Sequence, residues 1–425
     1  IPIIPYMVPS ILISISYVFL FNPRIGIVNR YLVFLFNLQG PVFDIHSLFG
    51  MMWVTGVFEA PFAYLIISAA LMSMDSSLEE SARVLGSGIL ATLRRVVIPI
   101  IAPAILAAAT LNIVRALETF DIPAILGLRN RLIVFPTQVY RMMITGGRPD
   151  IQGASSLSMI IFVLAVLLVL LYRYFTRQTY KYAIISPKGY RPAITDIGRW
   201  KYLTLSFAIF YFVVSVALPT GVLIFVSFMP RFEVPTIEGL SRLTLTNYIN
   251  VFEFPAVGRA LFNSIFLAVV GATLAMLLCS LISYITVKMK IKGVGILESV
   301  AFLPFATPGI IIAVGLLWAY IFLPIGIYGT IWILMVGYIT RFIPFGIRSV
   351  SATLIQIHKE LEESSRISGA SWLKTFYSII LPLIKPGMIA GWVILSIIFL
   401  RELSISILLT KSGSQVLSVI IFDMY

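Results

Sequence analysis

The feature that most limits how this chain can fold is a series of long apolar runs. A bilayer core about 30 Å thick takes about 20 mostly apolar residues to cross as a helix, whereas a membrane β-strand needs only about 10 with alternating polarity. Of the 425 residues, 59% are apolar and 12% charged; an ordinary soluble domain has about 25% charged residues. We therefore predict an all-α, polytopic helical bundle in a lipid bilayer, which excludes a soluble enzyme, a disordered protein and a collagen-like chain. Nine spans are predicted, at residues 4–21, 48–73, 100–126, 155–173, 203–228, 259–287, 297–323, 327–350 and 383–410.

The distribution of Lys and Arg predicts which way the bundle faces. Alternate connections carry eighteen of these residues on one side and ten on the other, and the excess is typical of cytoplasmic loops. The side with eighteen is therefore predicted to be cytoplasmic. Topology also explains most of the formal charge of +13, so no nucleic-acid partner is expected.

Residues that could hold a metal or form a disulfide are few. The single cysteine, Cys279, lies in an apolar run and allows neither an intrachain disulfide nor a thiolate metal site. His46 and His358 are predicted on opposite sides of the membrane, which argues against a two-histidine site. No cofactor and no bound structural metal are expected.

A segment of thirty residues occurs twice, at a spacing of 283. Residues 78–107 and 361–390 are identical at twelve of thirty positions without a gap. Six predicted spans separate the copies, an even number, so both copies face the same side and the repeat is parallel rather than inverted. By the charge count that side is cytoplasmic. The matched pairs include Glu79 and Glu362, Glu80 and Glu363, Arg83 and Arg366, Gly86 and Gly369, Pro99 and Pro382, and Pro103 and Pro386.

The repeat divides the chain into a first repeat at 1–175, a cytoplasmic linker at 176–202 and a second repeat at 203–425. Before its copy the second repeat has two more predicted spans than the first, and after its copy it has one fewer. The chain also starts at Ile1 rather than Met. We therefore expect the first repeat to be incomplete at its N-terminal end and the second at its C-terminal end, in a natural chain of about twelve spans.

Each copy is too apolar and too patterned for an ordinary connection, and is predicted to form a helix, a turn and a second helix. Ser76 and Ser77 each precede a Glu by three residues, as in a capping box. Glu79 precedes Arg83 by four, which favours an ion pair along the helix, and the second copy keeps this spacing. The glycine of each copy allows a sharp turn. A short amphipathic helix exposed to the cytosol suits insertion into a partner's groove; the alternative is a helix lying on the lipid surface.

The repeated segment resembles the EAA loop of membrane permease subunits in ABC importers. That pattern has an acidic start, a Gly seven residues after the first Glu, and a Leu-Pro or Ile-Pro ending thirteen residues after the Gly. The letters "EAA" read Glu-Glu-Ser in both copies, a departure from the pattern. Two such loops in one chain resemble the fused ferric-iron type, to which Leu117–Leu128 and Leu400–Leu409 are most similar. The matching positions are Glu79, Gly86, Ile98 and Pro99, and again Glu362, Gly369, Leu381 and Pro382.

The resemblance implies a multi-pass permease subunit in a prokaryotic plasma (inner) membrane, with the type I ABC importer fold. Its two loops would dock into two ABC ATPase subunits, whose ATP binding and hydrolysis would rock the two halves. An extracytoplasmic solute-binding protein would deliver the solute to the outer loops at 22–47, 127–154, 229–258 and 411–415. The resemblance assigns ATPase coupling to Glu79, Glu80, Arg83 and Gly86 in the first copy and to Glu362, Glu363, Arg366 and Gly369 in the second.

No GxxxxGK[ST] phosphate loop occurs in the chain, so ATP hydrolysis is expected in a separate subunit and the chain is not expected to be an enzyme. By resemblance the expected solute is ferric iron, with polyamine, thiamine and phosphonate importers as alternatives. An alternative of another class is an ion-coupled secondary transporter with parallel halves. The repeated loop discriminates between the classes, because a secondary carrier has no ATPase to dock.

Ionisable side chains within predicted spans cost about 2.5–3.5 kcal/mol at the centre, so each calls for a role. They lie on matched helices of the two halves, and opposite charges are placed to meet across the pseudo-twofold axis. One interpretation is a polar cavity or gate lined by Arg115, Glu118, Asp121, Arg401 and Glu402; the other is static ion pairs near the outer ends of the spans. Both stay open, and the solute with them, because carboxylates suit a hard cation and arginines an anion. The complete set adds Glu59 and Arg341.

Overall fold

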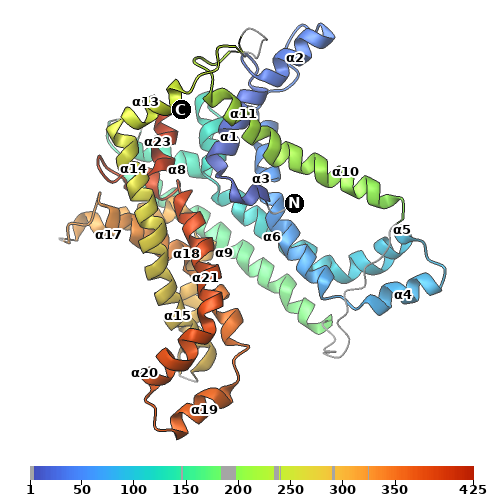
Figure 1. The fold of residues 1–425 in the computed structure, drawn as a ribbon, viewed down its shortest axis with the longest axis vertical. Coiled ribbons are helices and arrows are strands. Elements are labelled where there is room, and N and C mark those ends of the chain that lie inside the picture. The colour runs from blue at the N-terminus through green and yellow to red at the C-terminus, as the bar shows by residue number, and fades with distance from the viewer. Residues whose placement is uncertain are drawn as a thin grey trace. The chain divides into compact units, whose positions relative to one another are not determined.

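The protein is helical throughout the part of the chain that the structure describes (Figure 1). This computed structural model describes residues 4–144, 147–182, 198–233, 239, 241–289, 292–323 and 325–425, and every regular element in these ranges is a helix. Its contacts divide into two compact units, Ile1–Thr137 with Val163–Tyr248, and Gln138–Phe162 with Ile249–Tyr425. Each unit is described by itself. Of the predicted linker at 176–202, residues 183–197 lie outside the described ranges.

The first unit holds the helices of the first repeated segment. Its long helices α3 and α6 pack against each other, and α1 packs on α7 and α11. Three helices, α8 (Phe135–Ile144), α9 (Ile151–Tyr182) and α13 (Thr246–Glu253), cross the division between the units. The helices within the unit are α1 (Ser10–Phe21), α2 (Ile27–Phe36), α3 (Leu48–Met72), α4 (Ser76–Val84), α5 (Ile89–Thr92), α6 (Ile98–Glu118), α7 (Asp121–Leu126), α10 (Trp200–Phe212) and α11 (Leu218–Ser227), with short 3₁₀ turns at Ile4–Met7 and Leu128–Asn130.

The second unit is built on a three-helix bundle in which α15, α18 and α21 pack on one another. Within this unit α19 and α20 lie at one end of the bundle, and α14 and α23 lie at the other (Figure 1). The helices are α14 (Pro255–Phe266), α15 (Ala272–Lys288), α16 (Val294–Phe302), α17 (Gly309–Phe322), α18 (Ile331–Leu354), α19 (Lys359–Ile367), α20 (Trp372–Thr375), α21 (Leu381–Leu400), α22 (Ser406–Leu409) and α23 (Leu417–Met424), with a 3₁₀ turn at Leu303–Ala306.

The spacing of 283 seen in the sequence extends to the backbone. The helices α3 and α18 begin 283 residues apart, and so do α4 and α19, α5 and α20, and α6 and α21. The register is therefore kept from one long helix, through the connection, into the next. Sequence identity in the repeated segment reflects an equivalent local structure in each unit.

Among the described residues, seven helices are long and apolar enough to cross a membrane, and an eighth span results if a bent pair is counted as one. That pair, Val294–Phe305 with Gly309–Phe322, bends by 110° where Pro304 and Pro308 interrupt the predicted span 297–323, because proline removes a donor and disfavours helix before it. The predicted span 4–21 is also shorter than expected: its helix covers only Ser10–Phe21. The seven are Leu48–Met72, Ile89–Glu118, Ile151–Tyr172, Trp200–Ser227, Pro255–Lys288, Ile331–Leu354 and Trp372–Leu400.

Four of these spans contain one turn of π-helix. In the two repeated segments it occupies Leu93–Val97 and Phe376–Ile380, again 283 residues apart. Each of these turns, and a third at Val213–Ala217, is followed by an apolar residue and a proline. Proline cannot donate to the carbonyl four residues earlier and its ring clashes with that carbonyl. A wider turn relieves this clash and lets the helix continue.

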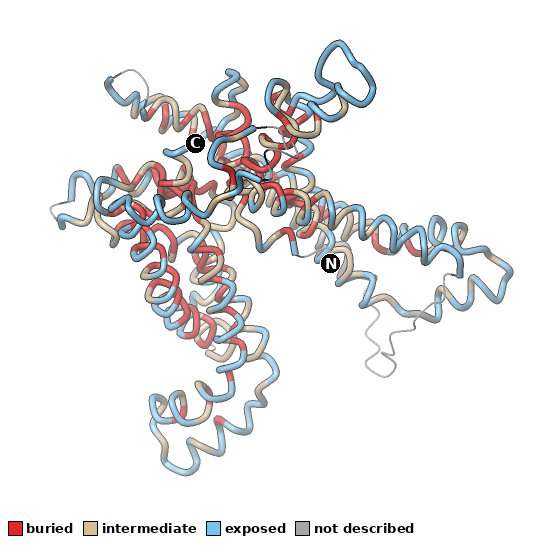
Figure 2. Tube along the Cα trace, turned by 45° about the horizontal axis from the view of Figure 1, so that its top comes forward, coloured by how far each residue is buried: buried red, intermediate tan, exposed pale blue. Residues whose placement is uncertain are grey.

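Close approach of helices holds the second unit's bundle together. Ser349 Oγ on α18 donates to the Gly387 carbonyl of α21 over 2.7 Å. A Cβ added at Gly387 would lie 2.5 Å from Thr353 Oγ1, and one at Gly346 would lie 2.6 Å from Cys279 Sγ. Small residues that let backbones approach are typical of helix packing in membranes. Buried residues accordingly gather in these long helices, whereas the connection through α19 is mostly exposed (Figure 2).

Candidate coupling helices and buried ion pairs

The helices α4 and α19 each end in a glycine turn of the same kind. Gly86 has φ +81° and Gly369 φ +79°. In the first copy the Gly86 and Ser87 amides donate to the Arg83 and Ala82 carbonyls over 2.9 and 3.0 Å. The second copy repeats both bonds at Gly369 and Ala370, over 2.9 and 3.1 Å. This is a Schellman motif, in which the residue after the helix must adopt a left-handed conformation that glycine tolerates best.

An apolar side chain protrudes beside each glycine turn. Val84 and Ile367 occupy equivalent positions and are each 87% exposed, and Leu85 is 85% exposed. These residues lie outside the candidate membrane spans, so they are not side chains that face lipid within a span. Each connection therefore presents an apolar tip on a fixed turn.

The start of α4 differs from the sequence expectation. The N-cap is Asp75, whose Oδ1 accepts a hydrogen bond from the Ser77 amide over 2.9 Å, rather than a serine capping box. Aspartate is at least as good an N-cap as serine, and its charge favours the positive end of the helix. The backbone and side-chain hydrogen bonds from Ser77 lower the pKa of Asp75 below its ordinary value.

The prediction of an ion pair along each of these two helices is wrong. Among the described residues, neither Glu79 with Arg83 nor Glu362 with Arg366 forms a salt bridge. Glu362 points inward instead. Its exposure is 8%, and its partners lie on α15. The other predicted coupling residues divide as follows: Glu79 is half-buried, and Glu80, Arg83, Glu363 and Arg366 are exposed.

The first unit contains a buried bidentate ion pair between α3 and α6. Arg115 donates from Nε to Glu59 Oε2 over 2.5 Å and from Nη2 to Glu59 Oε1 over 3.1 Å. The same Nη2 donates to the Tyr6 hydroxyl over 3.2 Å, and the guanidinium lies 4.8 Å from the Phe62 ring centroid. Glu59 is 4% exposed. A forked pair of this kind is a strong tie between two helices.

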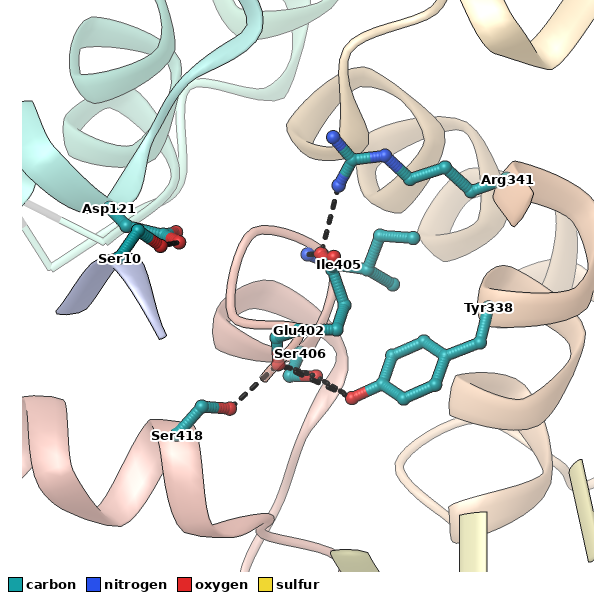
Figure 3. A network of polar contacts seen from close by, with 8 residues as sticks. All are labelled: Ser10, Asp121, Tyr338, Arg341, Glu402, Ile405, Ser406 and Ser418. Atoms are coloured by element: carbon teal, nitrogen blue, oxygen red, sulfur yellow. Dashed lines mark hydrogen bonds and ion pairs between the residues drawn. The ribbon is translucent and has the colours of Figure 1, made fainter. Parts of the chain in front are cut away.

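The second unit contains a corresponding pair with its polarity reversed (Figure 3). Arg341 on α18 donates from Nη1 to Glu402 Oε1 over 2.9 Å. The same carboxylate oxygen accepts from the Ile405 amide over 2.9 Å, just before α22. The Glu402 carbonyl accepts from Ser418 Oγ over 2.6 Å. Tyr338 and Ser406 hydroxyls bond to each other over 2.5 Å beside it.

Glycine makes room for the arginine of this second pair. A Cβ added at Gly309, the first residue of α17, would lie 2.0 Å from Arg341 Nη1 and 3.0 Å from the Ser404 Cβ. Any larger residue there would displace the guanidinium from Glu402. Each ion pair forms within its own unit, whereas the sequence pointed to pairing across the pseudo-twofold axis.

Three predicted pathway residues lie beyond the ends of spans rather than inside them. The predicted spans 100–126 and 383–410 end earlier, at Glu118 and Leu400, and Asp121, Arg401 and Glu402 follow the breaks. Asp121 opens α7 and accepts a hydrogen bond from Ser10 Oγ. Glu118 is the last residue of α6, and the residue at the spacing of 283 from it is Arg401, of opposite charge. Apolar residues continue across both breaks, which is why hydropathy alone extended the spans.

Sequence reasoning missed the partners that hold the charged residues. No sequence motif marks these partners, which are Tyr284, Lys288, Tyr338 and Ser418. Lys288 entered the prediction only as one of the basic residues that indicate the cytoplasmic side. Tyr284 lies 78 residues from Glu362 in the chain, and only the fold reveals such a contact. In the part of the chain that the structure describes, no group of three or more His, Cys, Asp or Glu could hold a metal ion.

Comparisons with known proteins agree with this architecture. The chain is 27% identical over 86% of its length and 52% of the relative's to the ferric transport system permease protein FbpB of Actinobacillus pleuropneumoniae. It is 27% identical over 84% of its length and 56% of the relative's to a Haemophilus influenzae protein named for ferric transport. A shorter match, 31% identical over 17% of the chain and 26% of the relative, is to the putrescine transport system permease protein PotI of Escherichia coli. The chain spans about half the length of the first two relatives.

A family model covers most of the chain, including both glycine turns and both ion pairs. It matches residues 1–180 and 277–425 and is described as the binding-protein-dependent transport system inner membrane component. The seven apolar helices agree with that membrane location. The chain therefore belongs to the family of binding-protein-dependent transport system inner membrane components.

Proposed function

We propose that this protein is a permease subunit of an ATP-driven ABC importer, in which α4 and α19 are the helices that dock into ATPase subunits. The observation that carries the proposal is the duplicated apolar tip: Val84 and Ile367 are each 87% exposed beside glycine turns with the same hydrogen bonds. Apolar surface that is exposed on a rigid turn favours a protein partner with a complementary groove. Two equivalent tips call for two partner sites.

The proposed mechanism uses the two repeats, 1–175 and 203–425, as bodies that move when ATP is bound and hydrolysed. Each repeat would carry one docking helix, so two ABC ATPase subunits are the expected partners. The family description names dependence on a binding protein, which supports delivery of the solute by an extracytoplasmic binding protein to the outer loops at 22–47, 127–154, 229–258 and 411–415.

The proposed solute is ferric iron. Support comes from the names of two relatives that match more than four-fifths of the chain. The polyamine alternative rests on the shorter match to PotI, and thiamine and phosphonate remain family alternatives. Ferric iron here is cargo, so the chain itself is proposed to need no resident cofactor.

We propose two different roles for the charged residues, one structural and one in the solute pathway. Glu402 and Arg115 hold their breaks in place through ion pairs within each unit. Glu118 and Arg401 are half-buried at equivalent span ends, and with Asp121 they are the proposed contacts of their repeats with the solute pathway.

Site-specific crosslinking tests the proposed function. Single cysteines placed at Ser87 and at Ala370, next to the turns, should each crosslink to a copurifying nucleotide-binding subunit in native membranes. Cys279 is fully buried and serves as an internal control that should not react. Absence of such a partner at both positions, together with solute uptake driven by an ion gradient, would instead establish a secondary carrier.

A further inference from the structure

One face of α19 is fastened to the membrane bundle by a buried carboxylate. Glu362 Oε2 accepts a hydrogen bond from the Tyr284 hydroxyl over 3.0 Å. Glu362 Oε1 lies 3.3 Å from Lys288 Nζ. Tyr284 and Lys288 both lie in the last turns of α15, so the contact joins the docking helix directly to the end of a membrane span.

The ammonium of Lys288 makes this contact more than a single ion pair. Its Nζ also donates to the Ile357 carbonyl over 2.6 Å, in the connection between α18 and α19. Its side chain is 6% exposed. One cation therefore fixes the end of α15, the connection and α19 at the same place.

The opposite end of α19 is fixed to the next span. The Ser365 and Thr375 hydroxyls bond to each other over 2.9 Å, which joins α19 to α20. The Tyr284 ring packs against Trp372 and Phe376, with ring centroids 5.8 and 5.3 Å apart. Glu362 and Ser365 are three residues apart on one helix face, so this face is held on both sides while Ile367 remains exposed.

A buried carboxylate is an unusual choice for packing a short polar helix, because each buried ion must recover its lost hydration through its partners. Such a pair stabilises little compared with apolar packing, yet removing one partner is severe and the geometry it permits is narrow. Those properties suit a contact that must keep the angle between α19 and α15 fixed while a bound ATPase moves. A docking helix that pivoted on its own would absorb the movement of a bound ATPase.

We propose that Glu362 is a positioning residue, which, through Tyr284 and Lys288, locks α19 to the end of α15 so that movement of the docked ATPase reaches the membrane helices. The coupling part of this inference rests on the proposed function. The locking part does not, because it concerns contacts within one unit of the chain.

The locking part is tested by the mobility of α19. A spin label is attached to a cysteine at the exposed position Ser364, while the buried Cys279 remains unlabelled. Glu362→Gln keeps the size of the side chain and removes its charge, and Glu360→Gln makes the same change at an exposed position of the same helix. The label should become more mobile in Glu362→Gln and stay unchanged in Glu360→Gln. Equal mobility in the wild type and Glu362→Gln would overturn the proposal.

The coupling part is tested in proteoliposomes that contain the permease with its ATPase and binding protein. Solute transported per ATP hydrolysed, normalised to the amount of bound ATPase, should fall about fivefold or more in Glu362→Gln. Reversing the pair, with Glu362→Lys and Lys288→Glu together, should restore part of the ratio lost in either single variant. An unchanged ratio, or a reversed pair no better than the single variants, would refute coupling through this contact.

Two further outcomes are distinguishable. If Glu362→Gln fails to insert, Tyr284→Phe removes only the hydroxyl bond and should give the same loosening to a smaller degree; unchanged mobility would then overturn the proposal. If the wild-type permease binds no ATPase, the proposed function and the coupling part fail together, and the mobility comparison alone decides whether α19 is locked.

Discussion

Replacing Gly369 with alanine tests whether the glycine turn itself, rather than the space around it, sets docking. The turn is well suited to the test because a Cβ added at Gly369, or at Gly86, meets no atom within 4 Å. Steric conflict is therefore removed as an explanation. What remains is the left-handed backbone, φ +79° at Gly369 and +81° at Gly86.

The magnitude follows from that conformation. An L-residue in the left-handed region costs about 1–2 kcal/mol relative to glycine, which makes the native turn about 5–30 times less populated relative to its alternatives. If only the native turn presents Ile367 correctly, the apparent dissociation constant for the ATPase rises by up to the same factor. A β-branched residue, being stiffer, should be worse, and Gly369→Val should abolish uptake.

The assay is equilibrium binding of the purified ATPase to the permease in lipid nanodiscs, alongside uptake and the amount of permease inserted. Gly369→Asn is the matched control, because asparagine tolerates the left-handed region better than alanine does. Affinity should rank glycine, asparagine, alanine, valine. Gly86 should follow the same order at the other helix.

Either of two results would refute this reasoning. Wild-type affinity in Gly369→Ala would show that the turn does not need its left-handed residue for docking. An asparagine variant weaker than alanine would show that side-chain chemistry, not backbone conformation, decides the effect. Normal uptake in both the Gly86→Val and the Gly369→Val variants would remove α4 and α19 as coupling helices.

Two further predictions concern stability. Glu402→Gln leaves the half-buried Arg341 without this carboxylate and should lower the unfolding free energy by about 3 kcal/mol. Reaction of Cys279 with a thiol-reactive dye on heating measures the unfolding, and a loss of stability no larger than in the exposed control Glu298→Gln would contradict the prediction. Asp75 has a lowered pKa, so its cap stabilises α4 above the ordinary aspartate pKa of about 3.9 and is lost as the pH falls through the lower folded value. Hydrogen exchange at the Ser77 amide, corrected for intrinsic rate, should show this loss in the wild type; Asp75→Asn, which keeps an acceptor oxygen, should not show it, and equal pH dependence in both would exclude the cap as its cause.

Features carried by long runs of sequence were predictable. In the part of the chain that the structure describes, seven apolar stretches form span-length helices, because twenty apolar residues in a row have few other ways to fold. The duplicated segment predicted its helix and its turn at Gly86 and Gly369, since glycine acts on the local backbone, and both glycines adopt the left-handed conformation. The spans that follow begin earlier than the predicted residues 100 and 383, at Ile89 and Trp372.

Features that depend on distant partners were not predictable. Nothing near Glu362 in the sequence indicates that it is buried while Glu363 is exposed; that follows from Tyr284, 78 residues away. The break after Leu400 is hidden by continuing apolar residues. It is stabilised by Glu402, which accepts a hydrogen bond from the Ile405 amide and pairs with Arg341. Local propensity and hydropathy register neither contact.

The reversed polarity of the two ion pairs shows why charge positions in the repeats are not identical. In the first unit the acid, Glu59, lies on α3 and the base on α6; in the second the base, Arg341, lies on α18 and the acid follows α21. A tie between equivalent helices needs one charge of each sign, and either arrangement satisfies it, so the repeats were free to differ. What both preserve is a buried carboxylate neutralised within its own unit. A movement of one repeat against the other, as proposed for transport, would therefore leave these two pairs intact and expose neither Glu59 nor Glu402 as an uncompensated charge.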